Sequence, residues 1–99
     1  MFSKHHNPQH NLDELVKVLQ SAASDHKLMK EFLADLLTPQ ELEEIPLRWQ
    51  IVKRLAKGVP QQEIAQNLGM GVATVTRGSR ELRDEHGGFR LMLHKLKIS

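Results

Sequence analysis

Residues 61–80 constrain this chain more than any other segment, because they carry the spacing of two short helices joined by a tight turn. Ile64 and Leu68 stand four positions apart and give the first helix an apolar face. Gly69 follows directly and suits a turn residue in the left-handed conformation. Val72 and Val75 then belong to the inward side of a second helix. This spacing is typical of a helix-turn-helix.

We predict the helix-turn-helix over about residues 61–84, with its second helix in the major groove of DNA. The outward side of that helix carries hydroxyl and guanidinium groups that suit base edges and phosphates, from Thr74, Thr76, Arg77 and Arg80. The alternative is two ordinary amphipathic helices joined by a glycine turn. We favour DNA binding because several positions agree and because the polar face has no acidic residue before Glu81.

The charges of the chain are divided unevenly between its two halves. Residues 1–45 hold four lysines against eight acidic residues, a net charge of −4, whereas residues 46–99 hold ten Lys or Arg against four acidic residues, a net charge of +6. The basic half contains the predicted helix-turn-helix. Such an asymmetry is expected when one side of a protein meets phosphate, although a solvated run of charges is the plainer alternative.

Composition excludes several classes of function. The 99 residues allow one domain, and the absence of cysteine excludes disulfides, thiolate metal sites and cysteine nucleophiles. We find no nucleophile–base pair, no phosphate loop and no spaced metal ligands around His5, His6 and His10, so neither an enzyme nor a metal site is expected. Without a long apolar run or a signal-peptide pattern, we expect a cytoplasmic protein with no membrane partner.

Capping residues and apolar spacing predict six helices and no strand. We expect residues 1–10 to form a flexible N-terminal arm and residues 11–99 to form one helical DNA-binding domain. Asn11 is the predicted cap of the first helix, and Ser24 or Asp25 is that of the second. Each cap precedes a run of apolar residues with helical spacing.

The third helix has the clearest start in the chain, where Thr38 precedes Pro39 and Glu41 follows. We expect this helix to run to Lys57, and we expect Pro46 to kink or split it. The fourth helix is predicted to open at Pro60, the fifth to span about residues 72–84, and the sixth to follow the glycine pair at 87–88.

The first three helices carry more apolar surface than a small monomeric core can hide. A tight, intertwined homodimer would bury that surface. It would also present two recognition helices to two half-sites about one DNA turn apart, ~34 Å in the general docking geometry.

Three strings of residues are more specific than these patterns. They are Leu36-Leu-Thr-Pro39, Arg48 followed by Ile51-Val52 and Gly58, and Ala73-Thr-Val-Thr-Arg-Gly-Ser79. With them, residues 12–96 resemble the tryptophan operon repressors. The resemblance implies an all-α, six-helix, intertwined homodimer with a helix-turn-helix. It also implies a sequence-specific transcriptional repressor, activated by L-tryptophan as corepressor and directed to operator DNA of tryptophan biosynthesis genes.

The resemblance also implies site residues. In the family, two arginines sandwich the indole and match Arg48 and Arg77, which is sensible because guanidinium planes stack on aromatic faces. The carbonyls that end the second helix would hold the ammonium, and the two sides of the pocket come from different subunits. The implied ligand site comprises Leu37, Thr38, Arg48, Arg77, Gly78 and Glu81. The implied DNA-contacting residues are Gln61, Gln62, Ala65, Val72, Ala73, Thr74, Thr76, Arg77, Arg80 and Arg83.

The chain departs from the family pattern at several of these positions. Glu81 stands where a serine is usual, and its carboxylate could bind the ligand ammonium or pair with Arg77 one helical turn away. Gln62 and Ala65 occupy positions that can carry arginine and lysine, so the operator sequence could differ. Two other classes therefore stay open: a regulator of the same fold that uses another small effector or none, and a helical interaction module.

Overall fold

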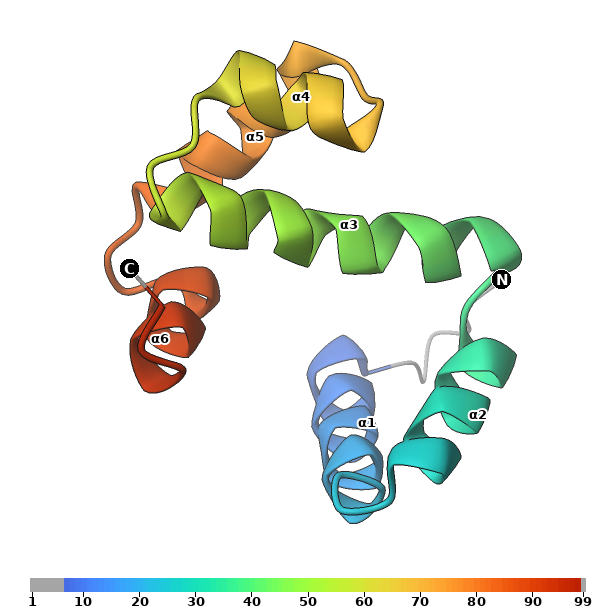
Figure 1. Cartoon of the computed structure of the whole chain (residues 1–99). Helices are drawn as coiled ribbons and strands as arrows, with labels where there is room; N and C mark the ends of the chain where they lie inside the picture. Colours follow the sequence, from blue (N-terminus) through green and yellow to red (C-terminus); the bar gives the residue numbers. More distant parts are fainter. Residues whose placement is uncertain (1–6, 99) are drawn as a thin grey trace. The chain divides into compact units, whose positions relative to one another are not determined.

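The computed structural model describes residues 7–98, and its regular structure in that range consists of six α-helices without a strand (Figure 1). This confirms the predicted all-α class. The chain divides into two compact units, the first ending at Leu42 and the second beginning at Glu43. The helices are α1 (Pro8–Ser21), α2 (His26–Leu36), α3 (Pro39–Ala56), α4 (Gln61–Leu68), α5 (Val72–Leu82) and α6 (Gly88–Lys95). The boundary between the units falls inside α3.

The cap of helix α1 lies four residues earlier than the predicted cap at Asn11. Asn7 is the cap instead, because its Oδ1 accepts the backbone N–H of His10 at 3.2 Å, and Pro8 takes the first helical position. An N-terminal proline has the φ angle of a helix and loses no hydrogen bond there. Residues 8–10 are thus helical and not part of a flexible arm, whereas residues 1–6 of that predicted arm lie outside the described residues.

The starts of α2 and α3 agree with the sequence prediction. Asp25 caps α2, since its Oδ1 accepts the backbone N–H of Leu28 at 3.0 Å. At α3, the Glu41 N–H donates to Thr38 Oγ1 at 3.1 Å, and the Thr38 N–H donates to Glu41 Oε1 at 2.9 Å. These reciprocal bonds form a capping box, which satisfies backbone donors that a helix start leaves unpaired.

Helix α3 passes through Pro46 as one helix, so of the two predicted outcomes, a kink or a split, the split is wrong. A proline removes one backbone hydrogen bond, but the turns on either side keep theirs. The segment that follows is also held by the burial of Ile51 and Val52. The helix ends at Ala56, and Gly58 beyond it adopts a φ of 85°, a conformation that favours glycine.

Two apolar clusters on the C-terminal half of α3 hold the second unit together. Ile51 packs with Ile64, Ala65 and Val75, which joins α3 to α4 and α5. The neighbouring Val52 packs with residues of α5 and α6 in a separate cluster, with Leu82 and Leu93 as its buried members. Consecutive residues of one helix face different directions, so α3 can serve two clusters. In Figure 1, α4 and α5 accordingly lie along this half of α3.

Helices α4 and α5 adopt the predicted helix, turn and helix arrangement. Gly69 ends α4 with φ 66° and ψ 41°, the left-handed conformation expected of it. Helix α5 ends at Leu82, two residues before the predicted boundary. The carboxylate of Asp84 accepts the backbone N–H of His86 at 3.0 Å and so favours a turn there, while Arg90 Nε donates to the Leu82 carbonyl at 2.7 Å.

The first unit buries very little of its apolar surface. Between residues 7 and 42, only Ala22 is buried, and neither α1 nor α2 contains a buried residue. Leu12 is 60% exposed and Leu28 is 49% exposed. Both helices nevertheless carry an apolar face with helical spacing, and this face is only partly covered within the unit.

Candidate ligand pocket and DNA-reading face

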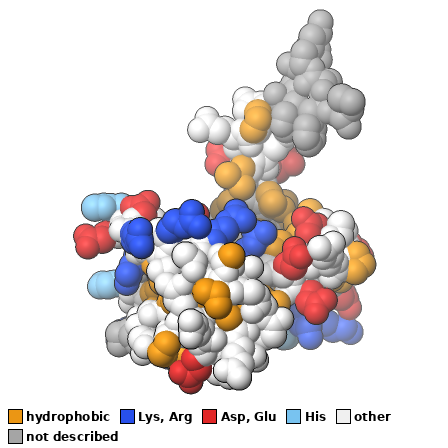
Figure 2. Space-filling model, turned by 90° about the horizontal axis from the view of Figure 1, so that it is seen from above, with side chains coloured by type: hydrophobic (Ala, Val, Ile, Leu, Met, Phe, Trp, Pro, Cys, Tyr) orange, Lys and Arg blue, Asp and Glu red, His pale blue; other side chains and the backbone are white. Residues whose placement is uncertain are grey.

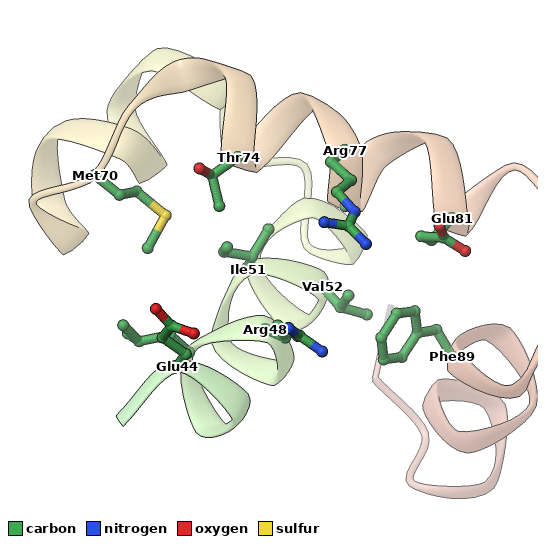
Figure 3. Close-up of a pocket in the computed structure, with 11 residues that line it drawn as sticks. Glu44, Arg48, Ile51, Val52, Met70, Thr74, Arg77, Glu81 and Phe89 are labelled. Carbon is green, nitrogen blue, oxygen red and sulfur yellow. The ribbon is translucent and has the colours of Figure 1, made fainter. Parts of the chain in front are cut away.

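A cavity of about 590 Å³ lies within the second unit, between α3 and α5 and beside α6 (Figure 3). Its apolar walls are formed by Leu47, Ile51, Val52, Met70 and Phe89. Its charged lining consists of two guanidinium groups and two carboxylates, from Arg48, Arg77, Glu44 and Glu81. Thr74 and Gly78 complete the lining. The cavity therefore combines an apolar body with charges of both signs.

Helical spacing places the charged groups at this cavity. Glu44, Arg48 and Val52 are four residues apart on one face of α3, and Arg77 precedes Glu81 by four residues on α5. Arg48 extends from α3 and Arg77 from α5 toward the space between the two helices (Figure 3). A flat molecule entering that space would meet a guanidinium from each helix.

Gly78 sets how closely α5 approaches α3. A Cβ atom added at Gly78 would lie 2.8 Å from Ile51 Cγ2 and 3.6 Å from Leu55 Cδ1. The first distance is too short for two carbon atoms in van der Waals contact. Because Ile51 is buried, its methyl group has little freedom to move away. The missing side chain at position 78 is thus what allows this spacing at the floor of the cavity.

Glu81 and Arg77 both line the cavity but do not form an ion pair with each other in the described part of the chain. Both side chains are exposed. The pairing with Arg77, one of the two roles expected of Glu81, is therefore not formed in this structure. Its carboxylate is available to a cationic group of a ligand.

Four of the residues implied as a ligand site line this one cavity: Arg48, Arg77, Gly78 and Glu81. Leu37 and Thr38 belong to the first unit, so their part in the site stays a prediction. The cavity also includes Glu44 and Phe89, which the sequence reasoning did not assign to it. The spacing of four between Glu44 and Arg48 was a usable signal, whereas Phe89 reaches the site through the path of α6 and had no local signal.

The predicted DNA-contacting residues have different degrees of exposure. Exposed side chains are those of Gln62, Val72, Ala73, Thr74, Arg77, Arg80 and Arg83, while Gln61 and Thr76 are half-buried. Val72 is 43% exposed at the start of α5, so its prediction as an inward residue is wrong, whereas Val75 is buried. Ala65 is only 4% exposed and packs in the cluster around Ile51, so its assignment as a DNA contact is wrong. A small side chain at this position lets two helices cross closely, and its methyl group is buried in the core. Figure 2 shows neighbouring Lys and Arg side chains gathered on one face.

None of the helices in residues 7–98 is long and apolar enough to cross a membrane. The same residues contain no group of three or more His, Cys, Asp or Glu side chains arranged to hold a metal ion.

Comparison with known proteins identifies the family. Residues 10–97 match the family described as Trp repressor protein. The Trp operon repressor homolog of Actinobacillus succinogenes is 48% identical over 69 residues, which cover 69% of this chain and 67% of the relative. That of Vibrio campbellii is 37% identical over 82 residues, 81% of each chain, and that of Pasteurella multocida is 46% identical over 69 residues, 69% of this chain and 67% of the relative. The chain therefore belongs to the Trp repressor family, a family of DNA-binding transcriptional regulators and not of enzymes.

Proposed function

We propose that this protein represses transcription as a homodimer that binds operator DNA when L-tryptophan occupies the cavity between α3 and α5. The observation that carries the proposal is that one cavity borders both the core helix and the second helix of the helix-turn-helix, with Arg48 on one and Arg77 on the other. A ligand held there contacts the DNA-reading helix directly. Its binding is thereby coupled to the position of that helix.

The chemistry of the cavity suits an aromatic amino acid. Its volume falls within the usual range for small-molecule sites, roughly 300–1,000 Å³. The guanidinium planes of Arg48 and Arg77 can stack on an indole, and either can also meet the ligand carboxylate. Glu81 can accept a charge-assisted hydrogen bond from the ammonium group. The remaining surface available to the ring is apolar, with Ile51, Val52 and Phe89 among its residues.

We propose a population shift as the mechanism. The buried residues of helix α5 are Val75 and Leu82, which pack against the rest of the second unit. Arg77 lies between them in the sequence and lines the cavity. An indole between Arg77 and Arg48 adds a contact that exists only when α5 lies close to α3. A ligand that prefers this arrangement raises its population, and so favours the spacing of the two reading helices required by DNA.

The exposed apolar faces of α1 and α2 support the dimer. Leu12 and Leu28 stand on helices that contain no buried residue, so the first unit by itself leaves much of their apolar sides exposed. Burying such faces against a second copy removes apolar area from water, about 25 cal/mol for each Å². A two-fold dimer also supplies two recognition helices for two half-sites in successive major grooves.

Calorimetry with L-tryptophan tests the proposal, together with operator binding at several salt concentrations. L-Tryptophan should bind, raise the unfolding temperature and strengthen DNA binding, and added salt should weaken DNA binding. Arg77→Ala should lose the response to L-tryptophan, whereas the control Arg83→Ala, outside the cavity, should keep its ligand affinity. An unchanged dissociation constant for L-tryptophan in Arg77→Ala would contradict the site assignment.

A second candidate is a regulator of the same fold with a different small effector. The two carboxylates among the cavity's charged groups favour it, because they increase the attraction for a cationic nitrogen. Titration with tryptamine, which keeps the indole and ammonium but lacks the carboxylate, separates the two candidates. Tighter binding of tryptamine than of L-tryptophan would favour a cationic effector.

A further inference from the structure

We propose that Thr76 is a positioning residue for Gln61: its hydroxyl holds the side-chain carbonyl of Gln61 so that the amide NH₂ group donates to a phosphate of the DNA backbone. The inference rests on the proposed function, because it requires that the helix-turn-helix binds DNA. It changes the role expected of Thr76, which the sequence places among the residues that contact DNA directly.

The observation is a side-chain hydrogen bond between the two helices of the motif. Thr76 Oγ1 lies 2.7 Å from Gln61 Oε1, and the pair is partly buried. Gln61 is the first residue of α4, and Thr76 lies in the middle of α5. The bond therefore links the start of one helix to a side chain of the other, across 15 positions of sequence.

Counting protons fixes the direction of this bond. The Thr76 hydroxyl has one proton to donate, and it lies 2.7 Å from Gln61 Oε1 and 3.0 Å from the carbonyl oxygen of Val72. An amide oxygen can only accept, so the shorter contact requires that Thr76 donates and Gln61 accepts. The Gln61 NH₂ group then keeps two donors. Within residues 7–98, this NH₂ group donates to no protein atom.

The place of Gln61 indicates which DNA group accepts its proton. In the general docking geometry, the first helix of the motif crosses the DNA backbone, while the second lies in the groove. Gln61 belongs to the first helix, so a phosphate oxygen is the expected acceptor. Phosphate oxygens only accept, and a side chain that presents only donors toward them matches that chemistry. Without Thr76, the amide could turn over and present its oxygen, which phosphate repels.

A double-mutant cycle tests this coupling. The affinity of wild type, Thr76→Val, Gln61→Met and the double variant is measured with L-tryptophan present, on the duplex that wild type enriches from a randomised library. Thr76→Ser serves as the conservative control because it keeps the hydroxyl. Gln61→Lys provides a second background, in which the side chain donates to phosphate without help from Thr76. Calorimetry with L-tryptophan verifies that each variant keeps a folded ligand site.

Thr76→Val and Gln61→Met should each weaken DNA binding about tenfold, the usual scale for one hydrogen bond to a charged group. The double variant should be no weaker than Gln61→Met alone. Thr76→Val should also have no effect in the Gln61→Lys background, and Thr76→Ser should bind within about twofold of wild type. The loss should be similar for every base substituted in the duplex, as expected for a phosphate contact.

Additive effects of the two substitutions would overturn the inference, and so would a changed base preference in Thr76→Val. Equal losses in Thr76→Ser and Thr76→Val would overturn it as well, because the hydroxyl would then be irrelevant. Those results leave the proposed repressor function standing. If the wild-type protein with L-tryptophan enriches no duplex, the proposed function itself fails and the inference fails with it.

Discussion

The two units of this chain contrast in how they use their apolar residues. The second unit, from Glu43 onward, buries seven hydrophobic residues in clusters that join α3 to α4, α5 and α6. In the described part of the first unit, only Ala22 is buried. Both units have amphipathic helices with clear caps, so helix formation does not distinguish them. What differs is whether the unit itself supplies a surface that covers the apolar face.

This contrast separates two sources of helix stability. Burial between helices of the same chain stabilises α4 and α5, whereas α1 and α2 show local capping bonds and uncovered apolar faces. Short helices are marginal in water without tertiary packing. The proposed homodimer would supply such packing for the first unit. The second unit can then carry the ligand pocket and the DNA-reading face on a scaffold completed within one chain.

The largest expected effect is in the core of the second unit. Ile64→Ala removes a fully buried side chain and should lower the free energy of unfolding by about 3 kcal/mol, since it loses apolar burial and leaves a cavity. Urea denaturation measures the loss, and sedimentation should show that the variant stays dimeric. A loss below about 1 kcal/mol would contradict the assigned packing of α4 against α3.

In the first unit, a substitution on the apolar face should weaken the proposed dimer, whereas the core substitution in the second unit should leave it intact. Leu12→Glu places a charge on the exposed apolar face of α1 and should raise the dimer dissociation constant roughly a hundredfold, because both copies of the interface are affected. Sedimentation over a range of protein concentrations measures this. The control His10→Glu adds a carboxylate on a polar position of the same helix and should leave the dimer intact. A wild-type protein that is monomeric at high concentration would contradict the comparison.

The contact of α5 with α3 should tolerate no added methyl group at its closest point. Gly78→Ala should lower the free energy of unfolding by about 2 kcal/mol and weaken L-tryptophan binding, because the new Cβ meets the buried Ile51. Gly71→Ala is the matched control, since no atom lies within 4 Å of its added Cβ. Denaturation and calorimetry on both variants provide the measurement. Equal effects of the two substitutions would rule out the steric explanation.

A substitution at Glu81 tests whether its carboxylate contributes to the affinity for L-tryptophan. If its carboxylate accepts the ligand ammonium, Glu81→Ser should weaken L-tryptophan binding about tenfold. Glu85→Ser changes a nearby exposed carboxylate outside this cavity and should have little effect. Calorimetry at two salt concentrations measures both. Tighter binding by Glu81→Ser would mean that Glu81 competes for Arg77 and hinders the ligand.

The smallest expected effect concerns local capping at the start of α3. Thr38→Ala removes one side of the capping box and should lower the free energy of unfolding by about 1 kcal/mol. Ser24→Ala is a suitable control because Asp25, and not Ser24, caps the neighbouring helix α2. Thermal unfolding detects the difference. No change in Thr38→Ala would indicate that packing alone sets the start of α3.

The sequence predicted features that depend on nearby residues. The capping roles of Asp25 and Thr38 and the left-handed turn at Gly69 rest on bonds within a few positions, so their signals are visible in the chain. Errors arose where two local signals competed or where distant packing intervened. Asn7, followed by Pro8, caps α1 in place of the predicted Asn11. Helix α3 continues through Pro46, and its next buried residues are Ile51 and Val52.

For the candidate site, the family resemblance pointed to Arg48, Arg77, Gly78 and Glu81, and the structure brings all four to one cavity. The remaining wall residues could not be predicted in the same way. Phe89 lies on α6, and it reaches the cavity because α5 ends at Leu82 and the chain turns back. Ala65 shows the opposite case, since a position proposed as a DNA contact from the sequence is buried in the cluster that joins α3, α4 and α5.

By itself, the sequence determined the six helices, most of their caps and the succession of helix, turn and helix in the helix-turn-helix. These features depend on the spacing of residues and on hydrogen bonds between close neighbours in the chain. Only the tertiary structure decided which faces are covered within the chain, how closely α5 approaches α3 at Gly78, and which side chains share the cavity. Those properties depend on contacts between residues far apart in the chain. Local periodicity shows that a helix has an apolar face, but not which surface covers it.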